Sequence, residues 1–284
     1  MRKHEEIRNA AHRVAFLDPE ILELNGAVQR VVPDEPLDCG GDWTAQYRIW
    51  HAVGGLKDNG QSGMIGSLEL RRTAGDDPSQ FNLAIRHRLL MGDKRKWPAN
   101  GIHEIRVTMT CRNDLLGTPE RWRVEHVINR DGQILNELAL REDGEADGDG
   151  IRLRINGIDR AVRTPRPWTS CWNLFELVPR FVADGHRQAR FDLMENLRLH
   201  KPDQRLLRDE SRDCESARFG RLRKVSQTGR GILPFDYWIN QRGRMIFAVN
   251  LHTAYILDAD ADAMVQRTYD DRIVRDPGER DDTE

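Results

Sequence analysis

The amino-acid sequence predicts an all-β protein: an antiparallel meander forming a closed or strongly curved barrel of about twelve strands, with short N-terminal helices and one internal helix. From Trp43 onward, apolar and polar residues alternate with the period of two that marks a strand with one buried face. Turn-forming pairs such as Asp131-Gly132 and Asn156-Gly157 separate the alternating runs. Curvature leaves few exposed strand edges, and a barrel of this size has room for a small ligand.

The chain divides into three predicted parts. Residues 1–30 predict a helical segment, in which Asp18 and Pro19 supply a cap and a first-turn proline. Residues 31–269 predict a single β-barrel-like domain, because a chain of 284 residues can bury a substantial core. Residues 270–284 are acidic and poor in apolar side chains, which predicts a flexible tail.

The alternating runs place the individual strands. The predicted strands span 43–53, 63–73, 80–91, 102–111, 120–130, 133–141, 150–156, 189–199, 218–227, 232–240, 243–250 and 252–258. The segment from Glu142 to Gly150 is acidic and rich in glycine, and it predicts a loop. Apolar residues from Trp172 to Phe181 have helical spacing, and they predict an internal helix that Pro179 limits and that plugs one end of the barrel.

Composition excludes two classes of partner. The number of lysine and arginine residues nearly equals the number of aspartate and glutamate residues. The net charge of −2 therefore gives no excess of positive charge for binding nucleic acid. No apolar stretch reaches membrane-spanning length, so we expect no membrane partner. No signal-peptide core follows the first residues, which predicts a cytoplasmic protein, with an export signal already removed as the alternative.

Cysteine and glycine spacing argue against two further kinds of site. Cys39, Cys111, Cys171 and Cys214 are widely separated, which predicts free thiols and neither a zinc ribbon nor a disulfide scaffold. The glycines at 229 and 231 are not followed by a helix, so no phosphate-binding loop forms and no nucleotide cofactor is expected.

Four histidines are in phase with the apolar residues of four different predicted strands. His87, for example, alternates with Arg86 and Arg88 and shares parity with Ile85 and Leu89. Such phasing predicts that all four rings project from one face of the sheet. The four histidines are His51, His87, His103 and His126.

Hairpin pairing predicts that these histidines form a row across the sheet. The turns that join their strands place His87, His103 and His126 nearly opposite one another, and longer turns carry the row back to about Met64 and then His51. Opposed side chains have Cβ atoms roughly 5 Å apart, so neighbouring imidazoles can share a divalent transition metal ion. The alternatives are proton transfer, or histidines that are hydrogen-bonded at the edge of the core.

Three further residues are candidates for catalytic roles. Glu195 is in phase with the apolar Leu193 and Leu197, and a lone carboxylate on an apolar face is costly, so it is a candidate fourth ligand or general base. Tyr237 and Tyr255 share parity with apolar neighbours, and they could offer hydroxyls to the same interior as acids or oxyanion partners. The alternative is that both are tyrosines satisfied within the core.

One stretch resembles a known group of proteins. The run Gly231-Ile232-Leu233-Pro234-Phe235-Asp236-Tyr237-Trp238 precedes a turn at Arg242-Gly243-Arg244 and a returning strand to Asn250. This hairpin resembles the C-terminal hairpin of uncharacterised bacterial LolA-like half-barrel proteins, in which a Gly-x-x-Pro-x-x-Tyr-Trp-like strand precedes a Gly-Arg turn. The resemblance implies a curved antiparallel sheet with an apolar concavity, and it implies no activity.

Three functional hypotheses follow from these observations. The first is an enzyme, a metal-dependent lyase or hydrolase or an isomerase, that acts on a small organic molecule through a histidine-lined interior. The second is a non-catalytic carrier or sensor of an apolar or sugar-like ligand in the same cavity. The third is an interaction module whose N-terminal helices mediate assembly, which would give a homo-oligomer.

Overall fold

The structure is a computed structural model. It describes residues 35–51, 64–91, 101–130, 132–136, 139–148, 150–164, 166–250 and 253–275. The predicted helical segment 1–30 lies outside the described residues. Within the described part of the chain, no helix is both long and apolar enough to cross a membrane.

Strands dominate the fold, as the alternation predicts, and seventeen of them belong to one sheet. They are β1 (Trp43–His51), β2 (Met64–Ala74), β3 (Gln80–Met91), β4 (Gly101–Arg112), β5 (Pro119–Arg130), β6 (Gln133–Ile134), β7 (Leu140–Asp147), β8 (Gly150–Ile155), β9 (Ile158–Arg163), β10 (Trp168–Ser170), β11 (Gln188–Glu195), β12 (Leu199–Arg208), β13 (Cys214–Ser216), β14 (Gly220–Thr228), β15 (Phe235–Ile239), β16 (Met245–Val249) and β17 (Thr253–Leu257). A short 3₁₀ turn, η2 (Glu210–Arg212), precedes β13.

The sheet is open rather than a closed barrel. Its hydrogen-bonded order is β10-β11-β12-β14-β15-β16-β17-β1-β2-β3-β4-β5-β7-β8-β9, with β13 on β14 and β6 on β5. Strands β9 and β10 end this order, and the described residues show no pairing between them. The parallel pairing of β10 with β11 also makes the sheet mixed, whereas the sequence predicts a purely antiparallel meander. Side chains partly bridge the opening, because Thr169 on β10 donates to the carbonyl of Leu116 in the β4–β5 turn.

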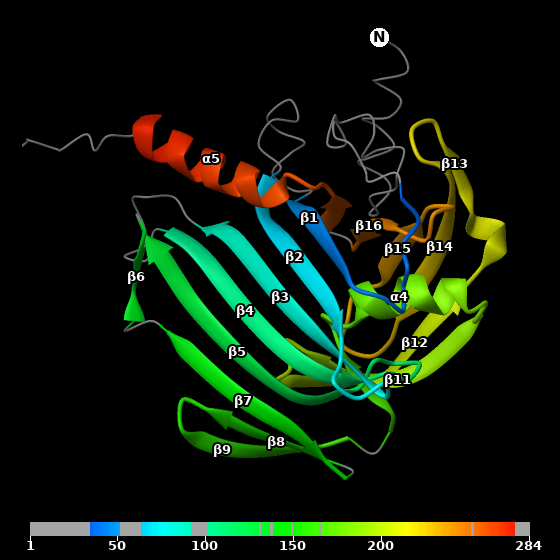
Figure 1. The fold of residues 1–284 in the computed structure, drawn as a ribbon, viewed down its shortest axis with the longest axis horizontal. Coiled ribbons are helices and arrows are strands. Elements are labelled where there is room, and N and C mark those ends of the chain that lie inside the picture. Colours follow the sequence, from blue (N-terminus) through cyan, green and yellow to red (C-terminus); the bar gives the residue numbers. More distant parts are fainter. Residues whose placement is uncertain are drawn as a thin grey trace, which may run out of the picture.

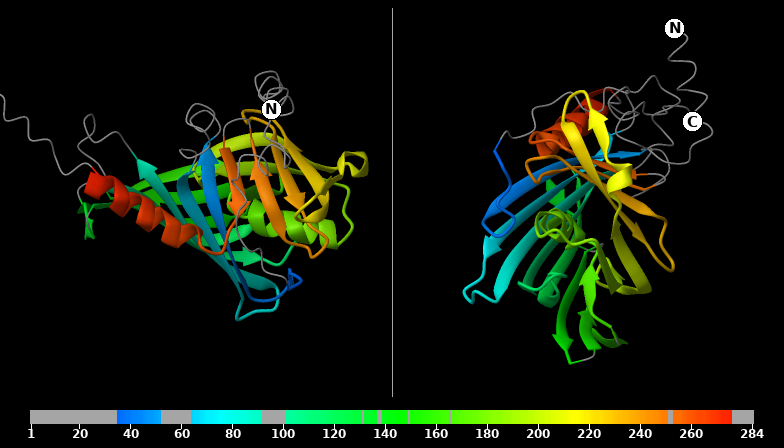
Figure 2. Two further views of the ribbon diagram at one scale, coloured as in Figure 1. Left: turned by 90° about the horizontal axis from the view of Figure 1, so that it is seen from above. Right: turned by 90° about the vertical axis from the view of Figure 1, so that its right-hand side faces the viewer.

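Strong curvature brings the two halves of the sheet to face each other. Strands β1 to β5 form one wall and β11 to β17 form the other, with helix α4 (Leu174–Ala183) between them (Figures 1 and 2). Helix α4 is buried along most of its length, which confirms the predicted internal helix. Pro179 does not limit it: the helix continues to Ala183, because packing on every side holds the turn that lacks the proline N–H.

A buried ion cluster fastens α4 to the wall. The carboxylate of Glu176 lies 2.9 Å from Nε of Arg180 and 3.5 Å from Nε of Arg72, which comes from β2. Arg72 also donates to the carbonyl oxygens of Gly40 and Gly41, at 2.6 and 2.8 Å. The side chains of Arg72 and Glu176 are almost fully buried, so each charge depends on the other for compensation.

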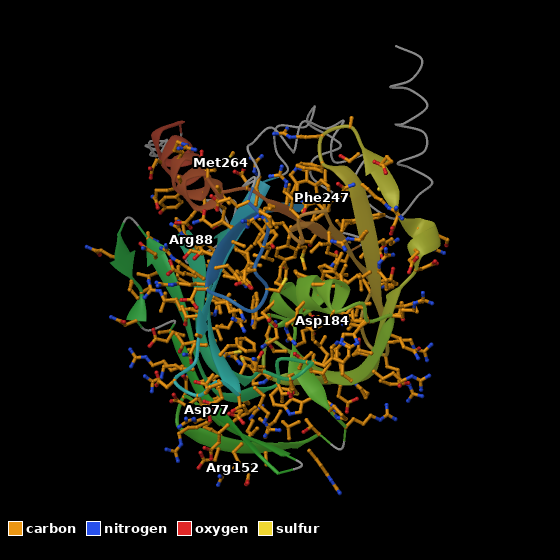
Figure 3. All side chains as sticks on the ribbon, turned by 45° about the vertical axis from the view of Figure 1, so that its right-hand side comes forward. Asp77, Arg88, Arg152, Asp184, Phe247 and Met264 are labelled. Atoms are coloured by element: carbon orange, nitrogen blue, oxygen red, sulfur yellow. The ribbon has the colours of Figure 1, made fainter. Side chains whose placement is uncertain are left out.

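A second helix, α5 (Ala261–Arg275), lies on the outer face of the sheet over β1 to β3 (Figure 1). Val265 is buried there against Leu90 and Ile102. Arg88, which lies beneath α5 in Figure 3, donates to the Asp262 carboxylate at 2.8 Å. Residues 270–275 of the predicted flexible tail instead form the end of this helix, and residues 276–284 lie outside the described residues.

Strand β7 replaces the loop predicted from Glu142 to Gly150. Glu142 is fully buried and accepts from Nε1 of Trp122 at 3.0 Å, so this carboxylate belongs to the sheet interior. Gly144 makes room for the same indole, because a Cβ atom there would lie 2.1 Å from Cε2 of Trp122. Gly144, which contributed to the loop prediction, thus allows the indole to pack closely against the backbone of a strand. Strands β9, β10, β12 and β13 are also absent from the prediction.

Candidate functional site

The observed register tests the predicted histidine row. His87 lies opposite Ile105, and Ile105 lies opposite His126 on the next strand. His103 lies opposite Leu89, two positions before Ile105 on β4. All three histidines therefore occupy one face, as predicted, but His87 and His126 are separated by Ile105 and His103 is a diagonal neighbour of both.

His51 does not belong to this row. Through His87 the row continues to Leu68 on β2 and Tyr47 on β1, whereas His51 lies opposite Thr253 on β17. The prediction of Met64 and His51 is wrong because the β2–β3 register differs by four residues from the expected one, so that Leu68 rather than Met64 lies opposite His87 and Tyr47 rather than His51 follows on β1. The side chain of His51 lies outside the described residues.

Two histidine rings approach each other closely. The ring centroids of His103 and His126 are 5.7 Å apart, whereas the ring of His87 packs against Trp172 at 5.3 Å. In the described part of the chain, no three histidine, cysteine, aspartate or glutamate side chains converge as metal ligands do. The predicted ligand set thus reduces to one close pair of rings.

Burial, with a smaller contribution from the neighbouring His126, lowers the pKa of His87 to about 4, so this imidazole is neutral near pH 7. The pKa of His126 is also lowered, first by burial and then by the neighbouring charges of His103 and Arg198. Arg198 is itself paired with the buried Glu142 at 2.5 Å.

A cavity of about 560 Å³ lies between the two walls of the sheet and α4. Its lining is mainly apolar and comes from both walls, with Leu89 and Ile105 on one wall and Leu193 on the other. Four residues that the sequence singles out as site candidates line this same cavity. They are His87, Glu195, Tyr237 and Tyr255.

Aromatic rings cover one side of the cavity. Phe175 of α4 meets Tyr255 edge to face, with ring centroids 5.1 Å apart. Phe235 lies 6.2 Å from Tyr255 and stacks on Tyr237 at 5.0 Å. The expectation that both tyrosines face one interior is therefore confirmed, and their ring faces and edges offer a surface suited to an apolar molecule.

The tyrosine and cysteine groups on the wall are uncharged. The Tyr237 hydroxyl donates to Oε1 of Gln227 at 2.8 Å, and burial raises its pKa well above the usual value. Burial also raises the pKa of Tyr255 and raises that of the Cys171 thiol to about 12. The sulfur of Cys171 accepts from the backbone N–H of Asn196 at 3.2 Å. Tyr237 thus matches the alternative of a satisfied core tyrosine.

Glu195 lies at the partly exposed edge of the cavity. Its side chain is 41% exposed, and its carboxylate lies 3.5 Å from Nζ of Lys201. The predicted burial of a lone carboxylate on an apolar face is wrong, because β11 ends at this residue and the side chain reaches solvent and a lysine. A role as fourth metal ligand or general base stays a prediction.

Sequence reasoning missed the contribution of α4 to the site. Trp172 and Phe175 line the cavity beside Cys171. Their helical spacing predicts the helix, but the pairing that folds both walls around it depends on contacts between distant strands. Phe235 was also missed, although it shares the parity of Tyr237 on β15.

Comparisons with known proteins give no family. No protein-family model matches the chain, and no curated protein matches it. Among solved structures, a β-barrel-like protein of domain of unknown function DUF1849 from Brucella abortus has a TM-score of 0.48 and 11% sequence identity, covering 76% of this chain and 95% of that chain. The resemblance of the C-terminal hairpin to LolA-like proteins stays a prediction.

Proposed function

We propose that this chain binds an apolar small molecule in the cavity between the sheet and α4, as a carrier or sensor. The observation that carries the proposal is the cavity itself, about 560 Å³ in volume and walled mainly by aromatic and aliphatic side chains. Ligand pockets in proteins span roughly 300–1,000 Å³ and have apolar walls with a few polar groups. A molecule of drug or short lipid size fits that description.

The protonation states of the lining groups favour binding over proton transfer. A general acid or base works best with a pKa near the operating pH. The pKa of His87 is about 4 and that of Cys171 is about 12, while the pKa values of Tyr237 and Tyr255 are raised. Near pH 7 these four groups neither gain nor lose a proton readily, which suits a cavity that holds a ligand unchanged.

Filling the cavity is expected to abolish ligand binding. The hydrocarbon 1,6-diphenylhexatriene becomes fluorescent in apolar surroundings, so a saturable rise in its fluorescence reports occupancy of the site. Leu89 lines the cavity, and Leu89→Trp is expected to weaken binding more than about tenfold, a loss of at least about 1.4 kcal/mol, because the indole occupies ligand volume. The measurement is a fluorescence titration at constant protein concentration.

The matched control is Leu207→Trp, the same exchange at a leucine that is 47% exposed and outside the cavity. This variant is expected to bind the probe as the wild type does. Circular dichroism checks that both variants are folded. Failure of the wild type to bind the probe, or equal binding by a folded Leu89→Trp protein, would contradict the proposal.

A metal-dependent enzyme is the second candidate, and the approach of the His103 and His126 rings to 5.7 Å favours it. Such an enzyme would hold a divalent transition metal at this pair and act on a small organic molecule. Elemental analysis of purified protein is then expected to find stoichiometric metal that a folded His103→Ala variant loses. Absence of metal, together with unchanged thermal stability on adding zinc, manganese or iron, would count against this candidate.

A further inference from the structure

The hydrogen bonding of the cavity wall leaves one buried atom unsatisfied. Tyr237 donates to Gln227, and Nε2 of Gln227 in turn donates to Gln204 at 3.3 Å. Cys171 is paired with Asn196. Among the cavity-lining side chains that the structure describes, the buried polar atom without a hydrogen-bond partner is Nδ1 of His87.

The surroundings of His87 make its imidazole a binding feature. The residue is only 8% exposed, and its ring packs against Trp172 on the cavity wall. A buried nitrogen without a partner loses the hydrogen bonds that water would give it, and native proteins nearly always provide a partner, either protein, water or ligand. Protein atoms of the described residues supply no partner to the imidazole, and His87 lines the cavity, so a group inside the cavity is the natural partner of this ring.

The charges around the cavity argue against an ionic ligand. Glu195 stands at the edge and is paired with Lys201. Arg198, whose charge acts on His126, is paired with Glu142. His87 itself is neutral near pH 7, since burial lowers its pKa to about 4. A charged group buried beside it would lack a counter-charge, which is much more costly than burial of a neutral polar group.

We propose that the cavity selects molecules with an apolar body and one uncharged hydrogen-bonding group, such as a hydroxyl, that pairs with the imidazole of His87. This inference rests on the proposed function and specifies its ligand class. A neutral imidazole has one donor and one acceptor nitrogen, and a hydroxyl fits either nitrogen because it both donates and accepts. The apolar body lies against the rings of Phe175, Phe235 and Tyr255.

Head-group selectivity tests the inference on the wild-type protein. Bound 1,6-diphenylhexatriene is displaced at pH 7.5 by 1-decanol, decanoate or decylammonium, which share one chain length and differ in the charge of the head group. Decanol is expected to displace the probe at a concentration at least about tenfold lower than either ion, because only the ions must bury a charge. Equal displacement by decanol and decanoate would overturn the inference.

Substitution of His87 tests the role of its nitrogen. His87→Phe is expected to weaken the binding of decanol relative to that of the hydrocarbon probe by about three- to tenfold, because the probe makes no hydrogen bond. His87→Gln retains a donor and an acceptor and is expected to recover much of this loss. Circular dichroism and urea unfolding check both variants for folding.

The outcomes separate the two proposals. Absence of probe binding by the wild type would overturn the proposed function and this inference together. Probe binding without a preference for decanol, or with an unchanged ratio of decanol to probe affinity in folded His87→Phe, would overturn the inference and leave the proposed function standing.

Discussion

Replacing Glu176 by glutamine is expected to lower the free energy of unfolding by about 3–5 kcal/mol, the usual cost of removing one partner from a buried ion pair. The exchange keeps the shape of the side chain but leaves Arg72, which is 2% exposed, without a compensating charge. Arg180 loses its partner on the same helix turn. Urea unfolding followed by far-UV circular dichroism measures the loss.

Asp143→Asn is the matched control. It removes a carboxylate by the same isosteric exchange, but from an ion pair with Arg123 in which both side chains are more than half exposed. Solvent screens such a pair, so little change in stability is expected. Equal effects of Glu176→Gln and Asp143→Asn would show that the α4 cluster does not hold the helix between the walls.

Lowering the pH from 6.5 to 4 is expected to remove about 3 kcal/mol of stability through His87. The ordinary pKa of 6.5 applies to the unfolded chain, and burial lowers the pKa to about 4 in the native protein. Between these values the unfolded chain binds a proton that the native protein does not, so protonation favours unfolding. The contribution is fully present above pH 6.5 and is lost as the pH falls toward 4; the lowered pKa of His126 acts in the same direction.

Urea unfolding of the wild type and of His87→Phe at pH 7 and at pH 4.5 measures this contribution. The phenylalanine variant has no proton to bind at this position, so its stability is expected to fall less across the interval. Carboxylates titrate in both proteins, and their effects cancel in the difference. Parallel losses of stability in the two proteins would contradict the assignment of a buried, neutral His87.

The pairing of β3, β4 and β5 was the most predictable part of the site. These strands have long alternating sequences, and the turns between them are marked clearly in the sequence. Pairing then follows from turn position, and the face occupied by His87, His103 and His126 was predicted correctly. An offset of two residues was enough, however, to turn an expected row of opposed rings into diagonal neighbours.

The remaining features depend on contacts that local sequence does not encode. The β2–β3 register, which places Leu68 rather than Met64 opposite His87, leaves His51 outside the row. From the sequence, Gly144 indicates a loop. In the structure it lies in a strand, and the indole of Trp122 occupies the space that its side chain would fill. The cavity itself arises because the β11–β17 wall folds over α4, and this arrangement joins residues far apart in the chain, such as His87 and Tyr237.

The most direct test of ligand binding is a crystal structure of the protein with 10-bromo-1-decanol, in which anomalous scattering locates the bromine atom. Binding in the cavity predicts a bromine peak among the rings of Phe175, Phe235 and Tyr255, with the hydroxyl oxygen within hydrogen-bond distance of a ring nitrogen of His87. A peak elsewhere on the protein, or an empty cavity at a concentration that displaces the fluorescent probe, would contradict the proposal that this cavity is the binding site.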